Sequence, residues 1–142
     1  MKRFRLFLII LFILTIVYLS IWLEPPLPWL LIYPGLAHRS WDVQTNYSKR
    51  SEKDKTKFKE NIKNKLLKNP YVFMKNNYPY HVQADHWVLW IRSRINEKKV
   101  QEIIEKEIGI THKRDWTYYE NPPYLRSVPD MIHYHVFIKK YS

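Results

Sequence analysis

The sequence predicts an α+β domain, with an antiparallel sheet of about five strands and two packed helices, preceded by an N-terminal transmembrane helix. Three observations lead to this prediction. Two segments place apolar residues at helical spacing, several short segments are rich in β-branched and aromatic residues, and one apolar run near the N-terminus carries no charge. The connections over 76–84 and 121–130 contain prolines, which disfavour further helices there.

The composition excludes several classes of site. The chain has 142 residues, which allows one compact domain and a tail. It has no Cys, so it cannot hold a disulfide, a Cys-ligated metal or a thiol nucleophile. Its two Gly are too few for the glycine-rich loops that bind nucleotide phosphates. The net charge of +11 favours a polyanionic partner without saying which one.

The N-terminal segment predicts a membrane anchor. Residues 6–23 are uncharged and apolar, and as a helix they span roughly 27 Å, close to the thickness of a bilayer core. Basic residues lie in 1–5, and the next one after the run is Arg39, so the N-terminus is expected on the cytoplasmic side of a single-pass membrane protein. A cleaved signal peptide is the alternative. A Pro-rich apolar connector over 24–48 and the α+β domain over 49–142 follow.

The first predicted helix covers residues 51–68. It begins at a capping-box pattern formed by Ser51 and Asp54, with Asp in place of the usual Glu or Gln. Apolar residues at helical spacing follow. Between residues 49 and 75 there are ten Lys and Arg but three acids. This basic face is either a solvated helix surface or a contact for phosphates or lipid head groups.

The second predicted helix covers residues 97–108, with Asn96 as its N-cap and Gly109 at its C-terminal end. Segments dense in strand-forming residues predict the strands, which are 71–74, 86–92, 115–120 and 131–139.

The last strand carries the strongest functional pattern. Alternation in a strand places His133, His135 and Phe137 on one face, opposite the apolar residues of 132–138. Two imidazoles on one face can ligate a metal together with His86, can pair as nucleophile and orienting group, or can be half-buried structural residues. Spacing alone leaves these three interpretations open.

Four short motifs occur together with this strand. They are N-N-Y-P-Y at 76–80, H-W-V-L-W at 86–90, S-V-P at 127–129 and H-Y-H-V at 133–136. In this order they resemble the histidine-triad (HIT) superfamily. With N-P-P at 121–123, the set is more similar to an uncharacterised domain family of fungi and large DNA viruses, over residues 69–139. That second resemblance brings no established activity.

The HIT resemblance implies an α+β fold and nucleotidyl transfer or hydrolysis through a phosphohistidine. By position, His135 matches the nucleophilic histidine and His133 the first histidine of the motif, which would orient it. Asn121 and Ser127 fall where the superfamily holds ribose or phosphate, and we expect His86 to contact substrate as well. The sequence departs from the superfamily at Phe137, which replaces the third histidine and donates no hydrogen bond.

We therefore expect a membrane-anchored protein that binds a nucleotide or another phosphate ester, with membrane lipid as a further partner. We expect no cofactor, and nucleic acid is not expected as the main partner. Whether the protein is an enzyme stays open. The alternatives are a non-catalytic scaffold protein associated with a membrane or a virion, and a metal site built on His86, His133 and His135.

Overall fold

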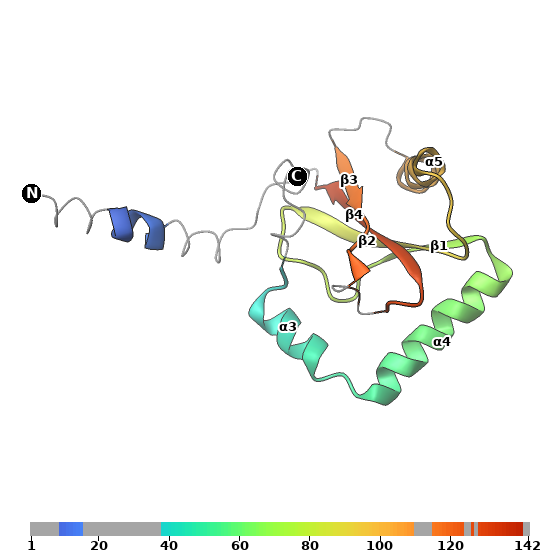
Figure 1. Ribbon diagram of the computed structural model, residues 1–142, viewed down its shortest axis with the longest axis horizontal. Helices are drawn as coiled ribbons and strands as arrows, with labels where there is room; N and C mark the ends of the chain where they lie inside the picture. Colours follow the sequence, from blue (N-terminus) through green and yellow to red (C-terminus); the bar gives the residue numbers. More distant parts are fainter. Residues whose placement is uncertain (1–8, 16–37, 110–114, 124–125, 127, 141–142) are drawn as a thin grey trace, which may run out of the picture.

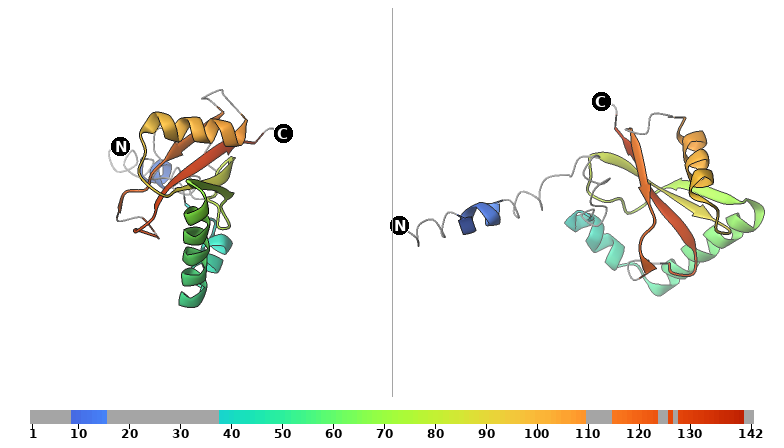
Figure 2. Two further views of the ribbon diagram at one scale, coloured as in Figure 1. Left: turned by 90° about the vertical axis from the view of Figure 1, so that its right-hand side faces the viewer. Right: turned by 45° about the horizontal axis from the view of Figure 1, so that its top comes forward.

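A computed structural model describes residues 9–15, 38–109, 115–123, 126 and 128–140. The described chain forms an α+β fold in which a four-stranded antiparallel sheet, in the order β1-β2-β4-β3, has helices on both faces (Figures 1 and 2). The strands are β1 (Tyr71–Lys75), β2 (Ala84–Ile91), β3 (Trp116–Tyr119) and β4 (Ile132–Lys139), and the labelled helices are α3 (Trp41–Ser48), α4 (Glu52–Lys68) and α5 (Glu97–Ile108). Helix α5 lies on one face of the sheet, and α3 and α4 lie on the other (Figure 2).

The centre of the sheet is the pairing of β2 with β4. Eight residue pairs, from Ala84 opposite Lys139 to Ile91 opposite Ile132, join the two strands in antiparallel register. Both strands are interior strands of the sheet. Since successive side chains of a strand point to opposite faces, β4 supplies apolar residues to one face and its two histidines to the other.

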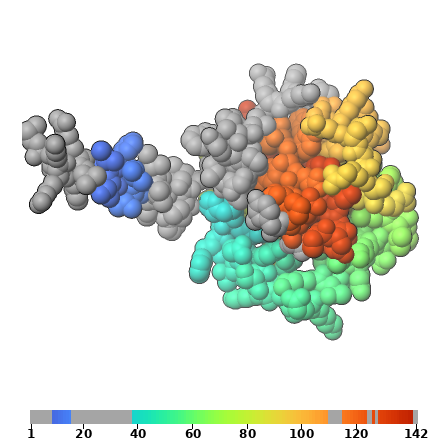
Figure 3. Space-filling view, in the orientation of Figure 1, coloured from blue at the N-terminus to red at the C-terminus, as the bar shows by residue number. Residues whose placement is uncertain are grey.

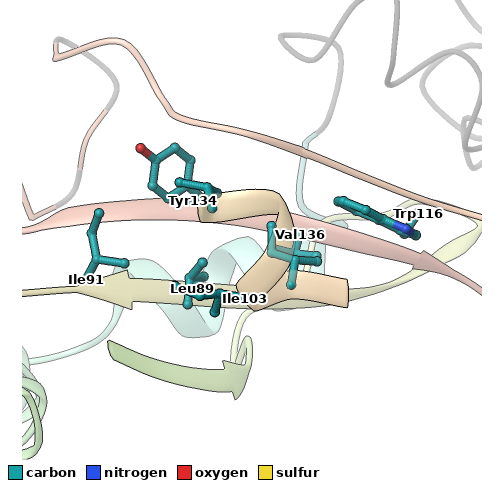
Figure 4. Close-up of a cluster of buried hydrophobic side chains, with 8 residues drawn as sticks. Leu89, Ile91, Ile103, Trp116, Tyr134 and Val136 are labelled. Atoms are coloured by element: carbon teal, nitrogen blue, oxygen red, sulfur yellow. The ribbon is translucent and has the colours of Figure 1, made fainter. Parts of the chain in front are cut away.

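The face covered by α5 holds a continuous apolar core (Figure 4). Leu89 of β2 and Val136 of β4 are fully buried there against Ile104 of α5. Local signals fix the position of this helix. The side chain of Asn96 accepts a hydrogen bond from the backbone N–H of Lys99, and Gly109 ends the helix in the left-handed conformation with φ of 66°.

The opposite face is covered in part by α4. This helix begins with the predicted capping box, in which Ser51 and Asp54 satisfy each other's backbone N–H groups. Its buried residues Ile62 and Leu66 pack with Val88 and other apolar residues of this face. The histidines of β4 lie on the same face.

The described structure departs from the predicted fold in two respects. It has four strands where about five were predicted. It also has a helix, α3, inside the predicted 24–48 connector. Arg39, just before this helix, donates from Nε to the carbonyl oxygen of Tyr78 in the connection between β1 and β2 at 3.2 Å.

The prediction of a transmembrane helix is also wrong. In the part of the predicted 6–23 span that the structure describes, residues 9–15 are helical. Across all described residues, no helix is both long and apolar enough to cross a membrane. This finding overturns the predicted single-pass anchor, and with it the membrane localisation and the expected orientation of the N-terminus.

The N-cap of α5 provides a test of the fold. Replacing Asn96 by Ala removes the acceptor for the Lys99 N–H, and we expect the free energy of unfolding to fall by about 1 kcal/mol. Asn64 is the matched control, because it is exposed within the interior of α4 and its replacement by Ala is expected to be neutral or slightly stabilising. Urea denaturation followed by circular dichroism measures both changes. Equal stabilities for the two variants would contradict the assigned cap.

Candidate functional site

A chain of hydrogen bonds runs through buried polar groups on the α4 face of the sheet. It begins at the backbone N–H of Tyr80, which donates to Nδ1 of His86 at 3.0 Å. Nε2 of His86 lies 2.9 Å from Nδ1 of His135. Nε2 of His135 in turn lies 2.9 Å from the side-chain amide of Asn121. The three side chains are 1–8% exposed, so all of these contacts form away from bulk solvent.

The first donor of the chain fixes where each proton lies. The Tyr80 N–H can only donate, so Nδ1 of His86 accepts, and the single proton of this neutral ring is on Nε2. This Nε2–H group of His86 donates to Nδ1 of His135, so the proton of the neutral His135 ring is on Nε2. The nearer amide atom of Asn121 is Nδ2, also a donor. Two donors cannot bond to each other. The side-chain amide of Asn121 is therefore assigned the orientation turned by 180°, in which Oδ1 accepts the hydrogen bond from Nε2 of His135.

The strand register explains why the two histidines meet. His86 lies opposite Phe137, and Val88 lies opposite His135. His86 and His135 are therefore diagonal neighbours on one face of an antiparallel pair, within reach of side chains of this length.

Asn121 is held in place by an ionic network in its own loop. Glu120 accepts hydrogen bonds from both terminal nitrogens of Arg94, at 2.9 and 3.1 Å, and from Arg126 at 2.7 Å. Nε of Arg126 also donates to the backbone carbonyl of Asn121 at 2.7 Å. Two arginines thus position the residue that ends the buried chain.

His133 belongs to a separate interaction. Its Nδ1 donates to the carbonyl oxygen of Met131 at 2.9 Å, so Nε2 carries the lone pair of the neutral ring. The ring packs on Trp90, with 4.5 Å between ring centroids, and lies at 73° to the ring of His135. Burial lowers the pKa of His133, which keeps its imidazole neutral at neutral pH.

His133 and His135 line a cavity of about 960 Å³. Its other lining residues come from α4 and its N-terminus, the 74–78 segment, β2, the loop before β4 and the ends of α3. Helices α3 and α4 form its outer wall and are the cyan-to-green band along the lower side of the space-filling view (Figure 3). His86 and Asn121 are not part of the lining. A ligand in the cavity would therefore meet the two β4 histidines, with the other two residues behind them.

The buried chain is electrically neutral. Burial is the main cause that lowers the pKa of His86 to about 2 and that of His135 to about 3. For His86 the neighbouring His135 ring and Arg39 lower the pKa further, and for His135 the further causes are His133 and Arg39. Neither ring can take a proton without losing an acceptor nitrogen of the chain.

The structure brings together four of the five predicted site residues, namely His86, Asn121, His133 and His135, and the fifth, Ser127, lies outside the described residues. The partners differ from those expected. His135 is oriented by His86 and Asn121, whereas His133 bonds to a backbone carbonyl. Both nitrogens of His135 are engaged, so the geometry favours His133 as the histidine that contacts a ligand.

The metal alternative finds no support in this geometry. Two nitrogens bound to one tetrahedral zinc ion at about 2.05 Å would lie about 3.3 Å apart on either side of the metal. The nitrogens of His86 and His135 face each other at 2.9 Å as a hydrogen-bonded pair. Among the described residues, no group of three or more His, Cys, Asp or Glu is placed to hold a metal ion.

Phe137 has become part of the core. It is fully buried in a cluster with Val82 and Ala84, and its ring stacks on that of His86 with centroids 4.5 Å apart. Phe137 therefore gives apolar support to the histidine chain and is not part of the cavity lining.

Sequence reasoning missed the residues at the two ends of α3. Arg39 and Arg50 line the same cavity, but they fall in or beside the segment interpreted as a connector. A signal was present, since residues 41–48 contain neither Pro nor Gly and follow a serine. The segment is too short and too weakly amphipathic for periodicity to predict it.

No protein-family model and no curated protein matches the sequence. Among solved structures, the chain is similar to the crystal structure of HTC1, with a TM-score of 0.55 and 17% sequence identity, over 83% of this chain and 86% of that one. At this identity the similarity concerns the fold alone.

The neutral histidine chain predicts a pH-dependent stability. An unfolded histidine titrates near pH 6.5, whereas His86 and His135 stay neutral in the folded state down to about pH 2 and 3. Below pH 6.5 the unfolded state therefore binds protons that the folded state does not. We expect the free energy of unfolding to fall with pH, by up to about 1.4 kcal/mol per pH unit for each histidine.

Urea denaturation between pH 7.5 and pH 5 measures this slope. His86→Gln is expected to reduce the slope by about one proton, whatever its effect on stability at pH 7.5. His38→Gln, at an exposed position, controls for the loss of one histidine from the chain. A stability that does not change over this range would contradict the assigned neutral pair.

Proposed function

We propose that this protein binds a phosphate ester in the cavity between the sheet and helices α3 and α4, and that Nε2 of His133 attacks its phosphorus. One observation carries the proposal. A neutral histidine, with Nδ1 held by the Met131 carbonyl and the lone pair on Nε2, lines a cavity of about 960 Å³ whose wall is rich in Lys and Arg. Imidazole is a good nucleophile at neutral pH when this nitrogen is unprotonated.

The cavity suits an ester of nucleotide size. Ligand cavities of small molecules usually measure 300–1,000 Å³, and this one lies at the upper end of that range. Phe58, Tyr78 and Trp90 line it beside the charged residues, which gives apolar surface for a base or another organic group. The resemblance of the β4 strand to the HIT motif points to the same class of ligand.

The proposed reaction has two displacements. In the first, the His133 Nε2–P bond forms as the ester O–P bond breaks, and the leaving oxygen takes a proton from water. In the second, water attacks the phosphorus, the N–P bond breaks, and the ring regains its lone pair while phosphate is released. The Met131 carbonyl accepts the Nδ1–H throughout, so it stabilises the positive charge that the ring gains on attack.

A non-catalytic binding protein is the second candidate, and Phe137 is the observation that favours it. This residue occupies the place of a third histidine and is buried away from the cavity, so it gives no contact to a phosphate or a leaving group. Such a protein would bind the same ester without forming a bond to it.

The test uses the full chain with two probes. Adenosine 5′-monophosphate measures binding by calorimetry, and p-nitrophenyl phosphate tests transfer through an acid-labile, alkali-stable phosphate found by ³¹P NMR. We expect both signals in the original chain. In His133→Asn we expect loss of the phosphoramidate and at most a few-fold weaker binding, because bond formation needs Nε2 while the cavity wall is unchanged.

His38→Asn is the control, since this histidine is exposed and does not line the cavity. Binding without a phosphoramidate in the original chain would reject the nucleophile and leave the non-catalytic candidate. Absence of binding for both probes would reject the phosphate-ester proposal itself.

A further inference from the structure

Two arginines at the ends of α3 stack on one tyrosine. The guanidinium carbon of Arg39 lies 3.9 Å from the ring centroid of Tyr47, and that of Arg50 lies 3.8 Å from the same centroid. Two guanidinium groups this close to one centroid would overlap if they shared a face of the ring. They therefore lie on opposite faces, in an arginine–tyrosine–arginine stack that we call the α3 clamp.

Each guanidinium of the clamp is anchored through its Nε. Arg39 donates from Nε to the carbonyl oxygen of Tyr78 at 3.2 Å, and Arg50 donates from Nε to that of Tyr47 at 3.1 Å. Nη1 of Arg39 makes one long contact to Gln44 at 3.4 Å. Within the described part of the chain, these contacts fix the two groups and leave terminal N–H donors for an anion.

The clamp also carries the uncompensated charge of the cavity wall. Each lysine of the lining has an acidic partner, as the pairs Lys55–Glu52, Lys59–Asp130 and Lys75–Asp85 show. Within the described residues, neither Arg39 nor Arg50 has a carboxylate within 4.0 Å. The two acids of this wall that follow Arg50 in the sequence are engaged elsewhere, Glu52 by Lys55 and Asp54 by Ser51 in the cap of α4.

The clamp lies beside the histidines. Arg39 is placed over Tyr80, at 5.2 Å from its centroid, and the ring of Tyr80 stacks on that of His135 at 5.4 Å. Arg39 and Arg50 line the cavity together with His133 and His135. An anion held by the clamp would therefore occupy the same cavity as the proposed nucleophile.

We propose that Arg39 and Arg50 are a diphosphate-binding pair, so that the ligand of this cavity carries two linked phosphates. With the ring between them, the two guanidinium carbons are separated by about twice the stacking distance of 3.8–3.9 Å. A single phosphate would have to reach around the ring edge to both groups, whereas two linked phosphates offer each arginine its own oxygens. This assignment rests on the proposed function, because it names the ligand of the same cavity.

The experiment titrates the full chain with inorganic pyrophosphate and with orthophosphate at constant ionic strength, by calorimetry. We expect pyrophosphate to bind at least ten-fold more tightly than orthophosphate. Arg39→Gln and Arg50→Gln should each weaken pyrophosphate binding at least ten-fold, and Arg50→Lys should recover part of the loss, since it keeps the charge without the planar fork. Thermal melting of each variant shows that it is folded.

Lys98→Gln is the charge-matched control, because Lys98 is exposed on α5, which covers the opposite face of the sheet. Its affinity for pyrophosphate should equal that of the original chain. Equal affinities for the two anions, or unchanged affinity in a folded Arg50→Gln variant, would overturn the diphosphate assignment.

A second readout separates this proposal from the proposed function. The imidazole NMR signals of His133 are followed during the same titration. If arginine-dependent binding leaves these signals unmoved, the clamp stands and the histidine proposal fails. If the signals move and the arginine variants bind normally, the clamp is overturned and the histidine proposal stands.

Discussion

The pairing of β2 with β4 is the constraint on which the rest of this structure depends. Both are interior strands, and residues of both pack on one face with α5 or on the other with α4. Although both faces are covered, one face of β4 carries His133 and His135. A buried polar group destabilises the fold unless it is hydrogen-bonded. The fold therefore has to supply hydrogen-bond partners for two imidazoles, and it does so differently for each.

His135 obtains one partner from the neighbouring strand β2 and one from the loop before β4, whereas His133 obtains its partner two residues earlier in the sequence. The diagonal contact to His86 and the loop contact to Asn121 use both nitrogens of His135. The Met131 carbonyl uses one nitrogen of His133. A single backbone donor at Tyr80 sets the direction of the longer chain, so the tautomers of two rings follow from one N–H. The two histidines of one short motif thus differ, since His135 has both nitrogens hydrogen-bonded and His133 bonds through Nδ1 and also lines the cavity.

Local signals allowed much of the fold to be predicted. Helices α4 and α5 begin and end within one residue of the predicted bounds, because Ser51, Asn96 and Gly109 act within a single turn. Alternation also predicted which face of β4 carries the histidines. It could not predict which nitrogen meets which partner, since this depends on the register with β2 and on a loop fixed by Arg94 and Arg126.

Long-range contacts account for the remaining differences. Helix α3 has no buried residue and a weak apolar stripe, so its place is set by contacts such as that of Arg39 with Tyr78, far away in sequence. The apolar run over 6–23 had the composition of a membrane anchor, but across the described residues no helix is both long and apolar enough to cross a membrane. The four segments dense in strand-forming residues correspond to the four strands of the sheet, so the expected count of about five had no fifth segment behind it.

The distribution of charge shows why composition was a poor guide to the site. Most of the surplus of +11 lies on residues 49–75, where lysines on α4 face solvent or pair with nearby acids. Such pairs and exposed lysines attract anions only weakly, since water screens them. A guanidinium fixed on an aromatic ring beside a cavity has lost part of its hydration and keeps a planar array of donors, so it binds a phosphate more strongly and in one orientation. Arg39, outside this segment, and Arg50, at its N-terminal end, are therefore the residues that we propose recognise the anion that the net charge suggested.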